Sequence, residues 1–431
     1  MLTEEARRER IGQMLALAKV YRGWTGTQLA AALGREPSRA VPATGNPKLD
    51  LMERLAAALE WETGEVAESL VDPESDEGGG ELEDIPFAEL DARAQQAHRA
   101  GDFAAMEGVA RAMRRIAASS HERAVAVNRL AGVYDGLGRY PRVLRCVQEG
   151  LAEERIGGDL RLMLVVNLAN AHYSLWNLHE SHAISNGLAE RFESDPPRGR
   201  LQHVALAFSH AIRGHSRRRM LGRCSSESEA ADVAVAAERD LSCAEEHYAR
   251  LAQQHDDMQY LCLANTARGG VIEAQVAAGR RSPEDALDEI VARLDDAIDL
   301  AAPRTPHLVE SWGWWSVFGA NIAMRAGGWR ADGAALAADE GERFEQAIAI
   351  CTNKAAEIAD HLDHWPMRER AFTIEWFRRE HVVRASCDEA VAWTLDSDDV
   401  RVLVGTMGRF PLFRPTGWKI LEHASVAESA A

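Results

Sequence analysis

The chain has 431 residues, of which 46% are hydrophobic and 27% are charged, as is usual for a globular protein of two or three domains. No stretch approaches the ~18 consecutive apolar residues of a membrane span, and the opening MLTEEARRER lacks the apolar region of a secretory signal. The six Cys have neither metal-binding spacing nor the intervals of a disulfide framework, so we expect free thiols in the cytoplasm.

The formal net charge of -18 is unevenly distributed along the chain. Residues 1–68 carry nine basic and ten acidic residues, whereas residues 69–86 carry seven acidic residues and no basic ones. Because DNA is a polyanion, the acidic parts of the chain repel it, and the first segment alone is balanced enough to approach it.

An N-terminal helix is predicted over residues 4–20. Its apolar residues fall on one face at three- and four-residue spacing, namely Ile11, Met14, Leu15 and Ala18. Thr3 is a suitable N-cap for this helix, and Gly23 interrupts the pattern after it.

Further short helices are expected in the segment that follows. Thr25 can cap the first of them, and Gly34 is well placed to end it in the left-handed conformation. Residues 36–41 form a candidate helix that Pro42 restricts, because proline lacks a backbone donor. The amphipathic helix over residues 48–59 has leucines four residues apart, at Leu51, Leu55 and Leu59.

The order and spacing of these helices, over roughly residues 5–65, resemble the helix-turn-helix domain of the Xre/Cro repressor family. The residues that carry the resemblance are Thr25, Leu29, Ala30, Leu33, Gly34, Gly45, Leu51, Leu55, Ala56 and Leu59. In that family the segment after the first Gly is the recognition helix, whose side chains reach base edges in the major groove. The resemblance therefore implies DNA contacts for Thr25, Gln28, Arg35, Ser38 and Arg39.

Two residues depart from the family pattern. Gly26 follows the capping Thr where the family has Gln, and Pro42 lies where the recognition helix should continue. The alternative is therefore a helical domain that serves dimerisation or docking rather than DNA binding.

Residues 72–86, DPESDEGGGELEDIP, combine three consecutive Gly with acidic residues and a closing Pro. Such a composition is typical of a flexible, self-repelling linker. We expect a linker over residues 71–86, a helix-turn-helix domain over 1–70, and helical repeats over 87–425.

Three units of similar pattern follow the linker at intervals of 37 and 38 residues. The matching positions are Ala94, Ala97, Gly101 and Phe103; Ala131, Tyr134, Gly138 and Tyr140; and Ala169, His172, Trp176 and Leu178. The units resemble the tetratricopeptide repeat, in which the Gly allows a tight turn between paired helices. Trp176 occupies the Gly position of the third unit, so the form of that turn is left open.

Amphipathic helices are also predicted over residues 227–254, 257–279, 284–301, 308–326 and 333–360. Residues 401–405, RVLVG, are the one short strand candidate. The predicted fold class is all-α, with a small helix-turn-helix bundle followed by a tetratricopeptide-like α-solenoid.

Three Asn residues are candidate ligand contacts. By the register of the repeats, Asn128, Asn167 and Asn170 lie on the concave face, where an amide can both donate to and accept from a peptide backbone. In bacterial regulators that join an Xre-type head to such repeats, Asn residues on this face hold a signal peptide, and the resemblance implies the same role here. The alternative is that they are solvated helix residues.

One dense basic cluster, IRGHSRRRMLGR, stands out in the acidic body. It contains Arg213, Arg217, Arg218, Arg219 and Arg223. The cluster is a candidate site for phosphate, nucleic acid or an acidic segment such as the 72–86 linker. The alternative is an exposed loop whose charges are neutralised locally.

Eight of the eleven Trp lie between residues 312 and 418. The run SWGWWSVFG places Trp312, Trp314 and Trp315 on more than one side of a helix. We expect some of them in the core, with an aromatic groove or a dimer contact as the alternative.

No motif points to catalysis. His179, Glu180 and His182 lack the spacing of a metal site, and the chain has no phosphate-binding loop, dinucleotide fingerprint or nucleophile elbow. We therefore expect no enzyme, no metal and no cofactor.

Together these features predict a cytoplasmic bacterial transcription regulator. Its head would bind DNA as a homodimer, because one such head makes too few contacts for a specific site. The groove of the repeats would bind a peptide or protein. The alternative is an adaptor that mediates protein–protein interactions and does not bind DNA.

Overall fold

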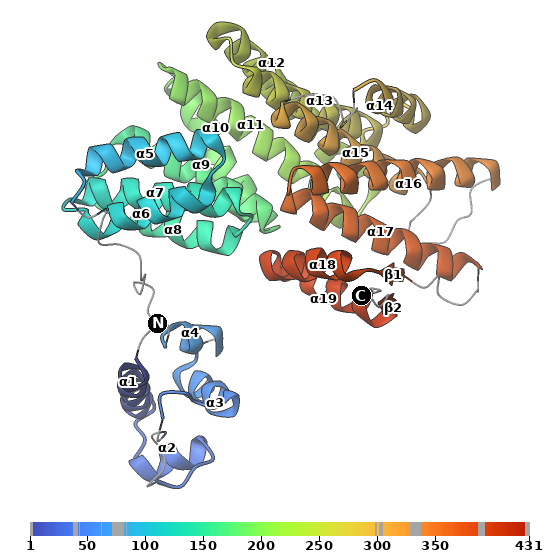
Figure 1. Ribbon diagram of the computed structural model, residues 1–431. Helices are drawn as coiled ribbons and strands as arrows, with labels where there is room; N and C mark the ends of the chain where they lie inside the picture. The colour runs from blue at the N-terminus through green and yellow to red at the C-terminus, as the bar shows by residue number, and fades with distance from the viewer. Residues whose placement is uncertain are drawn as a thin grey trace. The chain divides into compact units, whose positions relative to one another are not determined.

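The computed structural model describes residues 3–37, 42, 44–61, 63–70, 82, 84–297, 300, 305–327, 338–386 and 393–426 (Figure 1). These residues are almost wholly helical, so the all-α class is confirmed. The chain divides into two compact units, Met1–Glu81 and Leu82–Ala431. In the described ranges, no helix is long and apolar enough to cross a membrane.

The N-terminal unit contains four helices, α1 (Glu4–Arg22), α2 (Gly26–Ala32), α3 (Leu49–Leu59) and α4 (Thr63–Glu68). The Thr3 hydroxyl accepts a hydrogen bond from the Ala6 amide and so caps α1, and Gly23 ends α1 at a φ of 64°. Both predictions for the ends of this helix are therefore confirmed.

Helix α2 begins at a capping box. The Thr25 hydroxyl accepts from the Gln28 amide at 3.3 Å, and the Gln28 side-chain oxygen accepts from the Thr25 amide at 2.8 Å. Gly34 follows α2 at a φ of 63°, as predicted. The core of the unit lies between α1, α2 and α3 and includes Ile11, Met14, Leu15, Ala18, Leu29, Leu33, Leu51, Leu55 and Leu59.

The segment before α3 is held against the start of α1. Arg7 donates from Nε to the Gly45 carbonyl at 3.2 Å and from Nη2 to the Asn46 side chain at 2.9 Å. A Cβ at Gly45 would lie 2.0 Å from the Glu4 carbonyl oxygen, so this contact requires glycine. Pro42 is buried, and most of the 36–41 helix candidate lies outside the described residues.

The C-terminal unit begins with three antiparallel helix pairs. They are α5 (Phe87–Ala100) with α6 (Phe103–Ile116), α7 (Ser120–Gly136) with α8 (Tyr140–Ala152), and α9 (Gly158–Ser174) with α10 (Leu178–Ser194). The turns within the pairs are closed by Gly101, Gly138 and Trp176, at φ of 70°, 66° and 64°. The backbone of the third turn therefore matches the other two, although its residue is not Gly.

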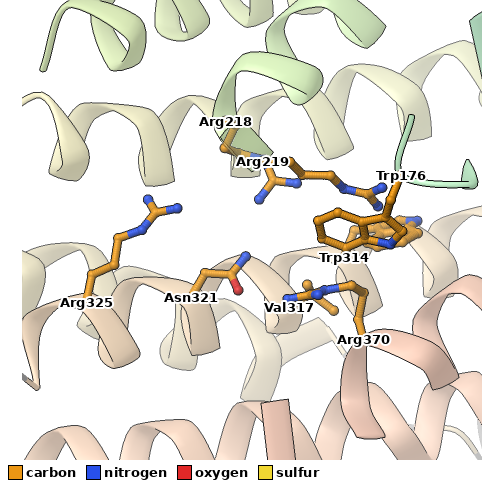
Figure 2. A pocket seen from close by; sticks show the side chains of 8 residues that line it. All are labelled: Trp176, Arg218, Arg219, Trp314, Val317, Asn321, Arg325 and Arg370. Carbon is orange, nitrogen blue, oxygen red and sulfur yellow. The ribbon is translucent and has the colours of Figure 1, made fainter. Parts of the chain in front are cut away.

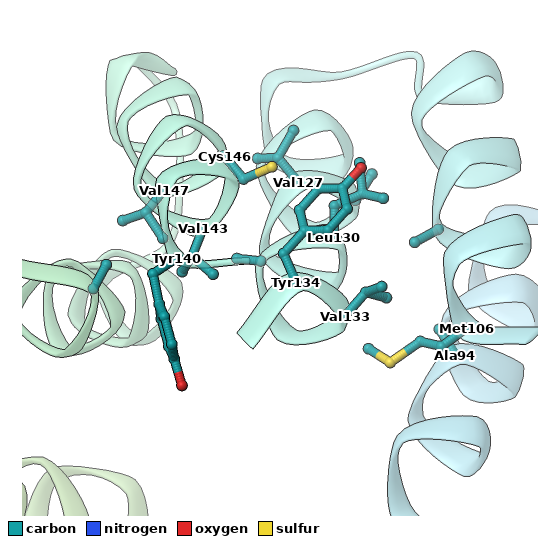
Figure 3. Packing of buried hydrophobic residues seen from close by; sticks show 14 of the residues in the cluster. Ala94, Met106, Val127, Leu130, Val133, Tyr134, Tyr140, Val143, Cys146 and Val147 are labelled. Atoms are coloured by element: carbon teal, nitrogen blue, oxygen red, sulfur yellow. The ribbon is translucent and has the colours of Figure 1, made fainter. Parts of the chain in front are cut away.

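The first two pairs share one apolar core with the start of the third (Figure 3). Small residues such as Ala94 and Ala131 are fully or almost fully buried where neighbouring helices approach each other. The larger side chains that fill the space between helices include Met106, Val127, Leu130, Val133, Tyr134, Tyr140, Val143, Cys146 and Val147.

The remaining helices continue in chain order, each packed chiefly on its neighbours. They are α11 (Arg200–Met220), the 3-10 helix η3 (Leu221–Arg223), α12 (Glu227–His255), α13 (Met258–Ala277), α14 (Pro283–Ala297), α15 (Pro306–Ala326), α16 (Ala338–His361) and α17 (Trp365–Ser386). The five helices predicted between residues 227 and 360 are present, and their ends agree within two residues where the structure describes them. The predicted end at residue 301 and the predicted start at residue 333 lie outside the described residues.

The chain ends with β1 (Trp393–Leu395), α18 (Ser397–Arg409), the 3-10 helix η4 (Pro411–Phe413), α19 (Arg414–His423) and β2 (Ala424–Val426). Strands β1 and β2 pair in parallel. The strand predicted at residues 401–405 is wrong, because these residues lie inside α18. Asp396 caps that helix, and the buried Leu403 and Met407 are four residues apart, as on one helix face.

The end of the C-terminal unit contacts its beginning. Arg409 Nε in α18 donates to the Leu137 carbonyl at 3.1 Å, and the rings of Tyr140 and Phe410 lie 5.7 Å apart. The Trp365 side chain, at the start of α17, packs directly on Gly138. Helices distant in the sequence thus meet at the α7–α8 turn.

Candidate functional site: a cavity lined by arginine and tryptophan

A small cavity lies inside the C-terminal unit, between the α9–α10 turn, α11, α15 and α17 (Figure 2). Its volume is about 70 Å³. The lining residues are Trp176, Arg218, Arg219, Trp314, Val317, Asn321, Arg325 and Arg370. Figure 2 shows Arg218 and Arg219 entering from α11 on one side, opposite Asn321, Arg325 and Arg370 from α15 and α17.

Helix α11 carries four of the five arginines of the basic cluster, and these arginines have different partners on the neighbouring helices. Arg213 and Arg217 both pair with Asp240 of α12, which is 1% exposed, and Arg213 Nη2 lies 2.6 Å from Asp240 Oδ1. The exposed-loop alternative is therefore wrong for these residues, although local neutralisation holds. Arg223 lies in η3 and is exposed.

Arg218 reaches the cavity beside a buried carboxylate. Arg218 Nη1 lies 2.6 Å from Oε2 of Glu273, a residue of α13 that is 0% exposed. Arg325 Nη2 lies 3.2 Å from the other oxygen of the same carboxylate. Burying a carboxylate is costly unless it is paired, so Glu273 explains the positions of these two arginines.

Arg219 is held differently. Its guanidinium lies over the rings of Tyr173 and Trp176, 3.8 Å and 4.4 Å from their centroids, and Nη1 donates to the Tyr173 carbonyl at 3.0 Å. Within the described part of the unit it forms no ion pair. Burial lowers the pKa of Arg219 to about 10, with a further contribution from the positive charges of Arg218 and Arg370.

Arg370 covers Trp176 as well. Its guanidinium carbon lies 4.9 Å from the centroid of that ring, and the structure shows no carboxylate paired with it among the described residues. Trp176 is therefore in contact with two guanidinium groups, one from α11 and one from α17. Cation–π contacts of this kind stabilise by roughly 0.5–2 kcal/mol each.

The backbone at Trp176 is unusual for such a large residue. A left-handed conformation costs a non-glycine residue about 1–2 kcal/mol. The turn has the same hydrogen bonds as the α7–α8 turn: Asn177 N donates to His172 O at 2.9 Å, and Arg139 N donates to Tyr134 O at 2.7 Å. Trp176 thus occupies a glycine position, and its ring lines the cavity.

The charges around the cavity are unequal. Four guanidinium groups line it, whereas the buried carboxylates that interact with them are Glu273 and Glu369 of α17. The cavity is therefore rich in N–H donors and positively charged, in a chain whose net charge is -18. Such a cavity is suited to a group with several hydrogen-bond acceptors.

The three predicted ligand-binding Asn lie outside this cavity. Asn167 Nδ2 donates to Asn128 Oδ1 at 3.0 Å, and Asn170 Nδ2 donates to Asp135 Oδ1 at 3.1 Å. All three are partly buried, on α7 and α9. Their side chains bind protein groups, and their role as peptide contacts stays a prediction.

The predicted DNA contacts are only partly described. Thr25 and Gln28 are exposed but hold each other in the capping box. Arg35 is partly buried just after Gly34, and Ser38 and Arg39 lie outside the described residues. The structure thus gives Thr25 and Gln28 a structural task in addition to any contact with DNA.

Three cavity residues belong to features that stand out in the sequence. Arg218 and Arg219 are part of the basic cluster, and Trp314 is part of the tryptophan run. The sequence pattern missed Arg325 and Arg370, because both residues lie more than 100 positions after the end of α11. The signal for Trp176 was present in the sequence as a bulky residue at the glycine position of a repeat.

No protein-family model, no curated protein and no solved structure matches this chain.

Proposed function

We propose that the chain is a DNA-binding transcription regulator whose C-terminal unit binds a ligand. The observation that best supports DNA binding is the form of the N-terminal unit. Helix α2 begins at the Thr25 cap, ends before Gly34, and packs with α1 and α3 around one apolar core. The same order of cap, short helix and glycine turn carries the resemblance to Xre/Cro domains.

Charge supports the same division of labour. The N-terminal segment is close to neutral, and the remainder of the chain is acidic, so DNA would approach the N-terminal unit. The C-terminal unit is a tetratricopeptide-like array in this proposal, with its ligand bound among the helices. A ligand would regulate DNA binding by favouring one arrangement of two heads over another.

The test uses the full-length chain and random duplex DNA at low salt. We expect the logarithm of the affinity to fall linearly with the logarithm of the salt concentration, because phosphate contacts release counterions. Arg35→Ala should weaken binding and lower the salt slope by about one. Arg10→Ala, which removes an exposed charge from α1, is the matched control and should leave the slope unchanged.

Absence of DNA binding at low salt would overturn this function. It would favour the second candidate, an adaptor that does not bind DNA. One observation supports the adaptor: Leu17, Val20 and Tyr21 lie on one face of α1 and are 54%, 81% and 59% exposed. In that case the face would bind a second copy of this chain, and Val20→Glu should convert a dimer into a monomer in a light-scattering measurement.

A further inference from the structure

We propose that the cavity between Trp176, Arg219 and Arg370 binds the phosphate group of a small ligand. The inference rests on the proposed function in one respect, since it specifies the chemistry of the ligand that the C-terminal unit would bind.

The charge of the cavity favours an anionic ligand. Glu273 already forms ion pairs with Arg218 and Arg325 at one end of the cavity. Arg219 and Arg370 add two further positive charges without an ion pair in the described residues. Glu369, the remaining buried carboxylate, accepts a hydrogen bond from Thr373 at 2.9 Å. An excess of positive charge at a partly enclosed site favours an anion.

The guanidinium N–H groups of Arg219 and Arg370 are donors that an anion can use. A guanidinium that stacks on an aromatic ring uses its face, and its N–H groups lie in its own plane and remain able to donate. One N–H of Arg219 is taken by the Tyr173 carbonyl. The side chains of Arg219 and Arg370 enter from opposite walls of the cavity (Figure 2). A tetrahedral anion has several acceptor oxygens and can accept from more than one guanidinium.

The backbone conformation of Trp176 also distinguishes this turn from the equivalent ones. The equivalent turns use Gly101 and Gly138, which adopt the same φ without strain. A residue held in a disfavoured conformation is a feature of functional sites, where the strain is maintained by what the side chain does. Here the strained backbone directs the ring to the place where it positions both guanidinium groups. We therefore assign Trp176 as a positioning residue of the phosphate site.

The size of the cavity limits the ligand. A cavity needs at least about 10–15 Å³ by this measure to hold one water, so a volume of about 70 Å³ is enough for a group of phosphate size. Two guanidinium groups already lie against the Trp176 ring, so an aromatic ligand is not expected to stack there. The remainder of a larger ligand would lie outside the cavity.

The test is titration of the full-length chain with inorganic phosphate at constant ionic strength, followed by calorimetry and by tryptophan fluorescence. We expect saturable binding by the wild type, and at least tenfold weaker binding by Arg370→Gln and by Arg219→Gln. Trp176→Gly should also bind at least tenfold more weakly while it remains folded, because glycine suits the backbone of the turn. Sulfate should compete with phosphate, and acetate and chloride should not.

The matched control is Arg200→Gln. Arg200 lies at the start of the same helix, and it stacks on the ring of Tyr260 at 5.3 Å, away from the cavity. This variant should bind phosphate as the wild type does. Phosphate affinity that is equal in Arg370→Gln and wild type, or absent from the wild type, overturns the proposal, and an equal response to acetate overturns the assignment to phosphate.

The measurement also separates this proposal from the proposed function. Arg370→Gln should bind random DNA at low salt like the wild type, because Arg370 lies in the other unit. Failure of DNA binding leaves the phosphate titration unaffected, and failure of the titration leaves DNA binding unaffected.

Discussion

The α7–α8 and α9–α10 turns have the same backbone conformation, but one has the smallest side chain at its left-handed position and the other has the largest. Gly138 and Trp176 have φ of 66° and 64° and close the same pattern of hydrogen bonds. At Gly138 the Trp365 side chain fills the space that a Cβ would occupy. Glycine is therefore favoured for two reasons: its positive φ and the close approach of Trp365. At Trp176 the neighbouring space is the cavity, and the residue supplies its own ring. The same backbone conformation therefore allows close packing in one helix pair and lines a cavity in the next.

The residues three positions before Gly138 and Trp176, which are Asp135 and Tyr173, also have different surroundings. Asp135 accepts a hydrogen bond from Asn170, and burial raises its pKa to about 6, assisted by the negative charge of Glu310. Tyr173 instead supports Arg219 with its ring and its carbonyl. Asp135 is thus influenced by a carboxylate, whereas Tyr173 lies against a guanidinium.

The largest expected effect tests the packing role of the first turn. Gly138→Ala should lower the free energy of unfolding by about 2–4 kcal/mol, since it adds left-handed strain and places a Cβ 3.0 Å from the Trp365 Cβ. Chemical denaturation of the full chain measures this loss. Gly101→Ala is the control: its φ is 70° and a Cβ there meets no atom within 4 Å, so its cost should be about 1 kcal/mol. Equal costs for the two variants would show that Trp365 does not constrain the turn.

A smaller effect on stability is expected from the titration of Asp135. The folded-state pKa of Asp135, about 6, exceeds the value of about 3.9 expected in the unfolded chain. The folded state therefore binds the proton more tightly, and the contribution of Asp135 to stability is present below pH 4 and lost as the pH rises through 6. Asp135→Asn removes this titration, while its side-chain oxygen can still accept from Asn170.

We expect Asp135→Asn to be more stable than the wild type by roughly 1–2 kcal/mol at pH 7. The gain is smaller than the full pKa shift implies, because the side chain is only partly buried and solvent screens it. The two proteins should have similar stability at pH 4. Unfolding curves at both pH values measure the difference, and a gain that is independent of pH would contradict the assignment to Asp135.

The smallest effect on stability is expected at the second turn. Trp176→Gly relieves about 1–2 kcal/mol of left-handed strain and removes two cation–π contacts of similar total size. The free energy of unfolding should therefore change by no more than about 1 kcal/mol. A loss above 3 kcal/mol would mean that Trp176 serves packing, as Gly138 does, and would remove the distinction between the turns.

The sequence pattern predicted most of the helices because their apolar spacing and caps are local. Thr3, Gly23, Gly34 and the repeat glycines act within one turn of the chain, where propensity and capping decide. The RVLVG strand was wrong because the preceding Asp396 cap and the burial of Leu403 favour a helix there.

The cavity could be predicted only in part. Its arginines from α11 were visible as a dense cluster, but which of them face carboxylates depends on α12 and α13. Arg370 comes from a helix whose approach to Trp176 depends on the tertiary arrangement of the unit. Contacts between residues so far apart leave no periodic signal in the sequence.

The contact between α18 and the α7–α8 turn also has a consequence for folding. Helical arrays usually have local contacts, so their folding can nucleate in any repeat and spread to its neighbours. The hydrogen bond from Arg409 to Leu137 joins residues 272 positions apart, and closing so long a loop costs entropy before the contact forms. This contact makes the first helix pairs depend on the last helices, so the C-terminal unit should unfold in one cooperative step rather than pair by pair.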